Sequence, residues 1–251
     1  MKDYSEYLFC SDIDGTLTYD RGKVSKENLD AIERFTSGGG TFVIATGRYP
    51  DFVDNFDYKV KAPIIALNGT LIYDVPNDKV MLAMPMEKKD CDIACDVFAT
   101  SGIDIVEVDV NFYDHTKAAK TPEKLREIFD TYNEPYKAVF VIRDENDGEK
   151  LCKFAKDKFG DKVKLMRSCF NLVEVINTKS GKANCMNWLR ENLPGIKTTV
   201  AVGDFENDIE MIAAADLGYA VENAIDEVKA VANRKAPKNT ENAIEYIVNS
   251  L

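Results

Sequence analysis

Histidine is almost absent from this sequence, and His115 is the single one in 251 residues. A Ser-His-Asp triad, a histidine-rich zinc site or a two-histidine relay would need this residue or more than it can supply. Paired cysteines are lacking too: the six cysteines form no CxxC pair, and Cys91 and Cys95 stand at helical spacing with no second pair nearby. The composition therefore disfavours catalysis or metal binding through imidazole and thiolate groups.

An excess of basic charge and long apolar runs are lacking as well. Lysine and arginine number 32 against 43 acidic residues, a formal net charge of −11, whereas nucleic acid or an anionic membrane would require a basic surface. No apolar run reaches about 18 residues, and residues 1–4 carry no basic-then-apolar leader. We expect a cytoplasmic protein with reduced thiols, a monomer or small homo-oligomer whose partner is a small molecule.

Short apolar runs that stop at polar residues are the clearest pattern near both ends of the chain. They predict buried parallel strands at 7–11, 41–45, 64–67 and 199–202. Amphipathic segments predict helices at about 25–37, 183–193, 207–215, 225–232 and 240–250. This order is typical of a Rossmann-like α/β domain with a parallel sheet.

The middle of the chain has a different pattern. Several of its strands alternate apolar and polar residues, which indicates a sheet with helices on one face. The expected strands are 80–84, 103–108, 138–142, 163–166 and 172–176, and the expected helices are 89–100, 122–132 and 148–159. We predict a discontinuous core, residues 1–75 and 179–251, that carries an inserted α+β domain, residues 76–178.

Acidic clusters follow two of the core strands at their carboxyl ends, where ligands bind in open α/β sheets. Asp12 and Asp14 stand two apart after the first strand and point to the same side of an extended chain, and Asp204 and Asp208 follow the last strand. Converging carboxylates would raise one another's pKa values unless a cation binds them. Oxygen donors without histidine or cysteine favour Mg²⁺, although any single aspartate could simply cap a helix or form a turn.

A phosphoryl group would find ligands at the other strand ends. Thr46 offers a hydroxyl and Gly47 an unobstructed backbone N–H, and Lys182 stands where a predicted helix begins, which suits an anion. Two roles stay open for Arg48: contact with substrate or insert, and a structural ion pair. The chemistry that this set predicts is attack of a carboxylate on phosphorus to form an aspartyl-phosphate, with Asp14 suited to act as general acid and base.

Four ordered motifs resemble those of the haloacid dehalogenase (HAD) superfamily, specifically its Cof-like phosphatases with a type-II (subclass B) cap. Asp12-Ile13-Asp14-Gly15-Thr16 is similar to the family's DxDGT, and Thr46-Gly47-Arg48 is similar to its second motif. Lys182 matches the third-motif lysine, and Gly203-Asp204 with Asn207-Asp208 matches the fourth motif. The insert between the second and third motifs has the size of a cap.

The resemblance implies a role for each motif. Asp12 would be the nucleophile and Asp14 the acid/base, and Mg²⁺ would be held by Asp12, the Asp14 backbone carbonyl and Asp204, with Asp208 in support. The expected phosphate contacts are Thr46, Gly47, Lys182 and Asn207. Asn68-Gly69 resembles a further family feature beside the site, and Ala183 departs from the glycine that many relatives have there.

We therefore expect a Mg²⁺-dependent phosphatase that hydrolyses a small phosphomonoester, with sugar phosphates as the favoured class. A phosphomutase is the alternative within enzymes, because it forms the same aspartyl-phosphate and passes it to a second hydroxyl. A phospho-switch of the receiver type also uses an acidic cluster, a threonine and a lysine. Such a module is shorter, and the insert would have no use in it.

Overall fold

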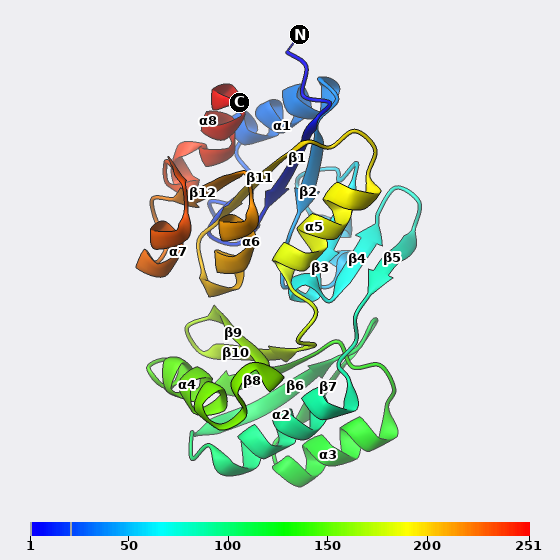
Figure 1. The fold of residues 1–251 in the computed structure, drawn as a ribbon, viewed down its shortest axis with the longest axis vertical. Coiled ribbons are helices and arrows are strands. Elements are labelled where there is room, and N and C mark those ends of the chain that lie inside the picture. Colours follow the sequence, from blue (N-terminus) through cyan, green and yellow to red (C-terminus); the bar gives the residue numbers. More distant parts are fainter. Residues whose placement is uncertain (1, 21) are drawn as a thin grey trace. The chain divides into compact units, whose positions relative to one another are not determined.

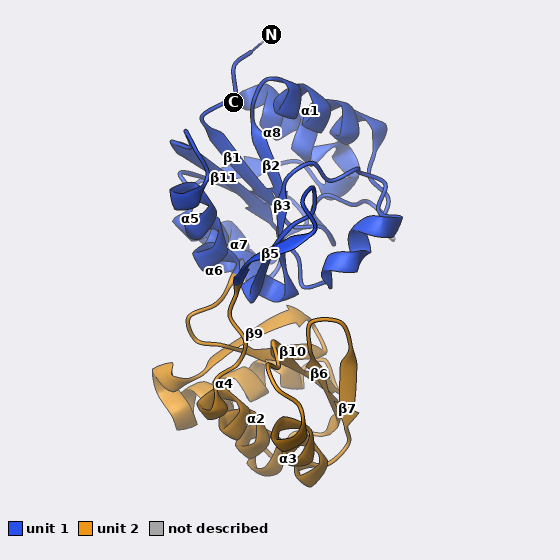
Figure 2. Cartoon of the chain, turned by 90° about the vertical axis from the view of Figure 1, so that its right-hand side faces the viewer, with its two compact units in different colours: residues 1–82, 182–251 blue, residues 83–181 orange. Residues whose placement is uncertain are grey.

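The computed structural model describes residues 2–20 and 22–251. The chain forms two compact units: residues 1–82 with 182–251 make up unit 1, and residues 83–181 make up unit 2 (Figure 2). Unit 1 is thus built from both ends of the chain, and unit 2 is inserted into it.

A five-stranded parallel sheet forms the centre of unit 1. The strand order is β13-β12-β11-β1-β2, and every neighbouring pair is parallel. The strands are β1 (Tyr7–Ser11), β2 (Thr41–Ile44), β11 (Thr198–Gly203), β12 (Leu217–Val221) and β13 (Arg234–Ala236). Strand β1 lies between β11 and β2. Its apolar run Leu8–Cys10 is completely buried, as expected for a strand that is covered on both faces. The predicted parallel sheet is confirmed, although β12 and β13 escaped prediction.

Helices cover both faces of this sheet (Figure 1). Helices α1 (Lys26–Ser37) and α8 (Ala243–Ser250) pack together on one face, and α5 (Lys182–Asn192) and α6 (Ile209–Ala214) pack together on the other. Helix α7 (Asp226–Val231) follows β12. Under α1, the ring of Phe9 packs edge-on against Phe35 and Phe42, with ring centroids 5.8 and 5.2 Å apart. This aromatic cluster ties the first helix to the central strands.

A small second sheet extends unit 1 beyond the predicted boundary. It has the order β3-β4-β5, formed by β3 (Pro63–Ala66), β4 (Leu71–Asp74) and β5 (Lys79–Ala83). The strand predicted at 80–84 was expected to belong to the insert. The unpredicted strand β4 pairs with β3 and brings β5 alongside as a hairpin, so unit 1 continues to residue 82.

Unit 2 is an antiparallel sheet with three helices on one face. The strand order is β7-β6-β8-β10-β9. The strands are β6 (Ile105–Asn111), β7 (Thr116–Ala119), β8 (Lys137–Ile142), β9 (Lys164–Cys169) and β10 (Leu172–Ile176), and the helices are α2 (Lys88–Thr100), α3 (Pro122–Thr131) and α4 (Asp147–Phe159). Helices and strands share one apolar core that includes Val97, Phe140 and Val173. The predicted sheet with one helical layer is confirmed, with β7 as an added strand.

Short 3-10 helices connect many of these elements: η1 (Pro50–Asn55), η2 (Leu67–Gly69), η3 (Gly160–Lys162), η4 (Glu206–Asp208) and η5 (Asn239–Glu241). The α-helices are short as well, since α2 and α4 have 13 residues each. Within residues 2–20 and 22–251, no helix is long and apolar enough to span a membrane.

A buried ion pair in unit 2 allows a test of the packing. The Nζ of Lys137 in β8 lies 3.0 Å from the Oε2 of Glu174 in β10, and these side chains are 7% and 3% exposed. Lys137→Met is expected to lower the free energy of unfolding by about 3 kcal/mol, because it removes the ammonium that pairs with the buried Glu174 carboxylate. Lys137→Met with Glu174→Leu should recover most of that loss in urea unfolding. Equal instability of the single and double variants would contradict the buried pair.

Candidate active site

The sheet topology gathers the predicted motifs at one end of unit 1. Strands β11, β1 and β2 are adjacent and parallel, so their carboxyl ends lie along one edge. Asp12 follows β1, Thr46 follows β2, and Asp204 follows β11. Lys182 is the first residue of α5. It follows the insert in the sequence, and the fold brings it to the same edge.

Lys182 is buried between two aspartates. Its Nζ donates to the Oδ1 of Asp12 at 2.8 Å and to the Oδ1 of Asp208 at 2.7 Å. The side chain of Lys182 is 1% exposed, and those of Asp12 and Asp208 are 8% and 1% exposed. Burial acts to lower the pKa of Lys182, but the two carboxylates outweigh it and raise the pKa above its usual value. The lysine is therefore a fixed positive charge in a buried site.

Asp204 completes a compact acidic cluster with Asp12 and Asp208. One carboxylate oxygen from each of the three lies within 4.8 Å of the others. The hydroxyl of Thr16 donates to the Oδ1 of Asp204 at 3.2 Å, and the backbone N–H of Asp204 donates to the Oδ2 of Asp208 at 3.1 Å. These hydrogen bonds hold the carboxylates of Asp204 and Asp208 in place.

Glycine is required at two points beside this cluster. A Cβ on Gly15 would overlap the carboxylate of Asp204, and a Cβ on Gly203 would overlap that of Asp208. Gly15 also has a φ of +82°, which side chains rarely adopt. The backbone can therefore approach the carboxylates only because these positions lack a side chain.

The cluster carries more negative charge than Lys182 can balance. Burial raises the pKa of Asp12 to about 7, with Asp208 adding to the effect and Lys182 opposing it. Burial and the charges of Asp12 and Asp208 raise the pKa of Asp204 to about 8. Three carboxylates against one ammonium leave two negative charges in excess when all are ionised. A divalent cation fits this donor set, because hard oxygen ligands suit Mg²⁺ or a similar ion.

The carboxylate of Asp14 lies outside the acidic cluster. Its two oxygens accept from Arg48: the guanidinium Nε lies 2.9 Å from Oδ2, and Nη2 lies 2.6 Å from Oδ1. The side chains are 39% and 58% exposed for Arg48 and Asp14. Of the two roles left open for Arg48, the structure contains the ion pair, and the partner is the predicted acid/base.

The other predicted phosphate ligands surround Asn68, whose role could not be predicted. Thr46 is buried, and its Oγ1 accepts from the backbone N–H of Arg48 at 3.2 Å. Gly47 lies against the Asn68 side chain. Asn207 donates from Nδ2 to the Oδ1 of Asn68 at 3.0 Å. The structure thus forms two groups: the acidic cluster around Lys182, and Thr46, Gly47 and Asn207 around Asn68.

Two residues of the site went unrecognised in the sequence. Thr16 was part of a motif without a role of its own, and its hydroxyl binds Asp204. Asn223 donates from Nδ2 to the carbonyl of Gly15 at 2.7 Å and so holds the turn after the DxD pair. The sequence contains a signal for Asn223. Leu217–Val221 is an apolar run that stops at polar residues, as the predicted core strands do, and Asn223 follows its end.

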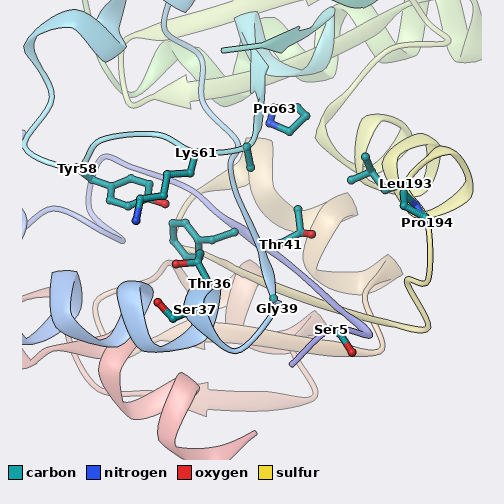
Figure 3. Close-up of a pocket in the computed structure, with 13 residues that line it drawn as sticks. Ser5, Thr36, Ser37, Gly39, Thr41, Tyr58, Lys61, Pro63, Leu193 and Pro194 are labelled. Carbon is teal, nitrogen blue, oxygen red and sulfur yellow. The ribbon is translucent and has the colours of Figure 1, made fainter. Parts of the chain in front are cut away.

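A hollow of about 530 Å³ lies at the opposite end of the same strands (Figure 3). Its lining includes Ser5, Thr41 and Pro63, which precede or begin β1, β2 and β3, whereas the acidic residues follow the ends of their strands. Tyr58 and Lys61 form another wall, and Lys61 Nζ is paired with Glu33 at 2.5 Å. This hollow is therefore distinct from the acidic site.

Known proteins resemble the chain over nearly its whole length. It is 25% identical to the 5-amino-6-(5-phospho-D-ribitylamino)uracil phosphatase YitU of Bacillus subtilis, over 95% of this chain and 94% of that protein. It is 26% identical to the pyridoxal phosphate phosphatase YbhA of Escherichia coli, over 95% and 96%. The solved structure of a haloacid dehalogenase-like hydrolase from B. subtilis superposes with a TM-score of 0.83 at 20% identity, over 97% of this chain and 99% of that one.

The family assignment rests on a match to almost the whole chain. A family model for haloacid dehalogenase-like hydrolases matches residues 9–248, which include most of both segments of unit 1 and all of unit 2. The solved relative has the same fold, and this confirms the α/β core with an inserted unit that the sequence predicted. The chain belongs to the haloacid dehalogenase-like hydrolases.

Proposed function

We propose that this hydrolase is a Mg²⁺-dependent phosphatase that cleaves a small phosphomonoester, such as a sugar phosphate, through an aspartyl-phosphate. The observation that carries the proposal is Lys182, buried between Asp12 and Asp208 and next to Asp204. YitU and YbhA support the substrate class, since both are named for small phosphomonoesters and the first of these carries a ribityl group. The division into a catalytic core and an inserted cap domain belongs to the same proposal.

Asp12 is the nucleophile in this mechanism. Lys182 holds its Oδ1 and leaves Oδ2 to attack phosphorus, which forms the acyl phosphate and breaks the bond to the leaving oxygen, so that the alcohol departs with a proton from Asp14. Water then attacks phosphorus, which releases inorganic phosphate and restores Asp12. The ammonium of Lys182, the Thr46 hydroxyl, the Gly47 N–H and the Asn207 amide stabilise the charge on the transferring oxygens. Such stabilisation is the main contribution of a protein to phosphoryl transfer.

A magnesium ion would be held by Asp12, Asp204 and the backbone carbonyl of Asp14, with Asp208 orienting the cluster. When bound, it neutralises the excess carboxylate charge and polarises the phosphoryl group. Asp208 suits the supporting role because Lys182 and the N–H of Asp204 already occupy its two oxygens.

Asp14 is the general acid and base. It protonates the leaving oxygen in the first step and takes a proton from the attacking water in the second. Each of its oxygens accepts one hydrogen bond from Arg48 and keeps a second lone pair for proton transfer. The pair is exposed, so water can reach Asp14 for the second step.

The nucleophile is tested by Asp12→Asn. The amide cannot form the acyl phosphate, so turnover of p-nitrophenyl phosphate with Mg²⁺ should fall by at least about 10⁴-fold. Asp30→Asn is the matched control, because Asp30 is an exposed aspartate on α1 paired only with Lys26 in the part of the chain described. It should keep the parent rate. Near-parent activity of Asp12→Asn would refute the proposed nucleophile.

Metal dependence is tested by removal and replacement. Treatment with EDTA should abolish hydrolysis, because without the cation the excess negative charge of the acidic cluster repels the substrate phosphate. Added Mg²⁺ should restore the activity. Asp204→Asn should raise the Mg²⁺ concentration needed for half-maximal rate by about tenfold or more. Activity that survives thorough chelation would contradict the metal site.

The pKa values of Asp12 and Asp204 predict how pH acts on the metal-free protein. Both pKa values are raised in the folded state, to about 7 and about 8, from the ordinary aspartate value of 3.8. The folded state therefore binds more protons than the unfolded chain, so its stability should fall as pH rises from about 5 to about 8. Mg²⁺ competes with these protons, and the rise in melting temperature on adding Mg²⁺ should grow over the same range. A Mg²⁺-induced rise that is independent of pH would contradict these shifts.

A further inference from the structure

The buried turn η2, residues Leu67–Gly69, has an unusual backbone. All three residues have left-handed φ angles, 50° at Leu67, 56° at Asn68 and 85° at Gly69, and all three are buried. Leucine rarely adopts this conformation, whereas asparagine and glycine tolerate it. Surrounding contacts must hold such a turn in place.

Those contacts come from segments that carry the proposed phosphate ligands. The N–H of Leu67 donates to the carbonyl of Arg48 at 3.0 Å, and the N–H of Asn68 donates to the carbonyl of Thr46 at 2.9 Å. The thiol of Cys185, one turn after Lys182 on α5, donates to the carbonyl of Gly69 at 3.1 Å. The turn is thus bonded both to the 46–48 loop and to the helix that begins at Lys182.

The side chain of Asn68 joins a further segment to this assembly. Its Oδ1 accepts from the Nδ2 of Asn207 at 3.0 Å. Its carboxamide also lies flat against Gly47, since a Cβ at that glycine would be 3.0 Å from Nδ2 and 3.2 Å from Oδ1 of Asn68. One fully buried amide therefore contacts two of the proposed phosphate ligands at once.

We propose that Asn68 is a positioning residue that holds Gly47 and Asn207 in register as one phosphate-binding unit. The inference rests on the proposed function, because it concerns the same site. Its side chain contacts Gly47 and Asn207, two of the proposed phosphate ligands, so we expect it to contribute to oxyanion binding. Loss of its side chain lets the two ligands drift apart while the acidic cluster stays intact.

The test is Asn68→Gly, assayed with orthovanadate as an inhibitor of p-nitrophenyl phosphate hydrolysis in the presence of Mg²⁺. Glycine keeps the left-handed backbone and removes only the amide. The inhibition constant for orthovanadate should rise about 10- to 100-fold, because small displacements of such ligands are costly. The Mg²⁺ concentration that half-saturates the thermal shift should change less than about twofold. A purely structural role would weaken both together, and an unchanged orthovanadate constant would refute the proposal.

Two further variants sharpen the comparison. Asn242→Gly is the matched control, because Asn242 is another left-handed asparagine, with φ 58°, at the start of α8. It should leave orthovanadate binding unchanged. Asn68→Asp keeps the size and an acceptor for Asn207 but adds negative charge against Gly47, so it should bind orthovanadate more weakly than Asn68→Gly does. Tighter binding by the aspartate variant would contradict the proposed placement.

A measurement without substrate separates this inference from the proposed function. If Asn68 and Asn207 are coupled, the double variant Asn68→Gly/Asn207→Ala should lose less melting temperature than the two single variants combined, by about 2–4 °C. Strict additivity would refute the coupling. A parent protein that neither hydrolyses phosphomonoesters nor binds orthovanadate would refute the proposed function, and the melting cycle would still decide the coupling.

Discussion

Burial of the Lys182 ammonium is the constraint on which the rest of the site depends. A buried lysine is costly unless carboxylates accept its hydrogen bonds, and Asp12 and Asp208 do so from two different strand ends. These three residues come from three distant parts of the chain, and Lys182 keeps its buried positive charge because both carboxylates are present. The interaction therefore links the formation of the site to the folding of unit 1.

The parallel sheet makes this convergence possible. Strand β1 lies between β2 and β11, so the residues that follow these strands emerge side by side although the inserted unit separates them in sequence. The insert leaves and rejoins unit 1 without breaking the sheet, because β11 pairs directly with β1. Glycines at 15 and 203 then allow the backbone to close in on the carboxylates.

The two groups of residues at this edge divide the proposed chemistry between them. The acidic cluster has negative charge in excess and suits a divalent cation, whereas Thr46, Gly47 and Asn207 present neutral groups around Asn68. A protein with a net charge of −11 can bind a phosphate only where such local charges are compensated. Burial and neighbouring carboxylates raise the pKa values of Asp12 and Asp204, and a bound cation would offset this effect.

The sequence by itself determined the fold class and most of the candidate residues, because buried strands are continuous apolar runs and their polar ends mark the edge where ligands bind. Strand β13 is short and mostly exposed, lacks that pattern and was not predicted. Only the tertiary structure decided that Asp14 pairs with Arg48, that its carboxylate stays apart from the acidic cluster, and that Asn68 joins Gly47 to Asn207. Such pairings depend on side-chain directions and distances between segments far apart in the chain, which local patterns of hydrophobicity do not encode.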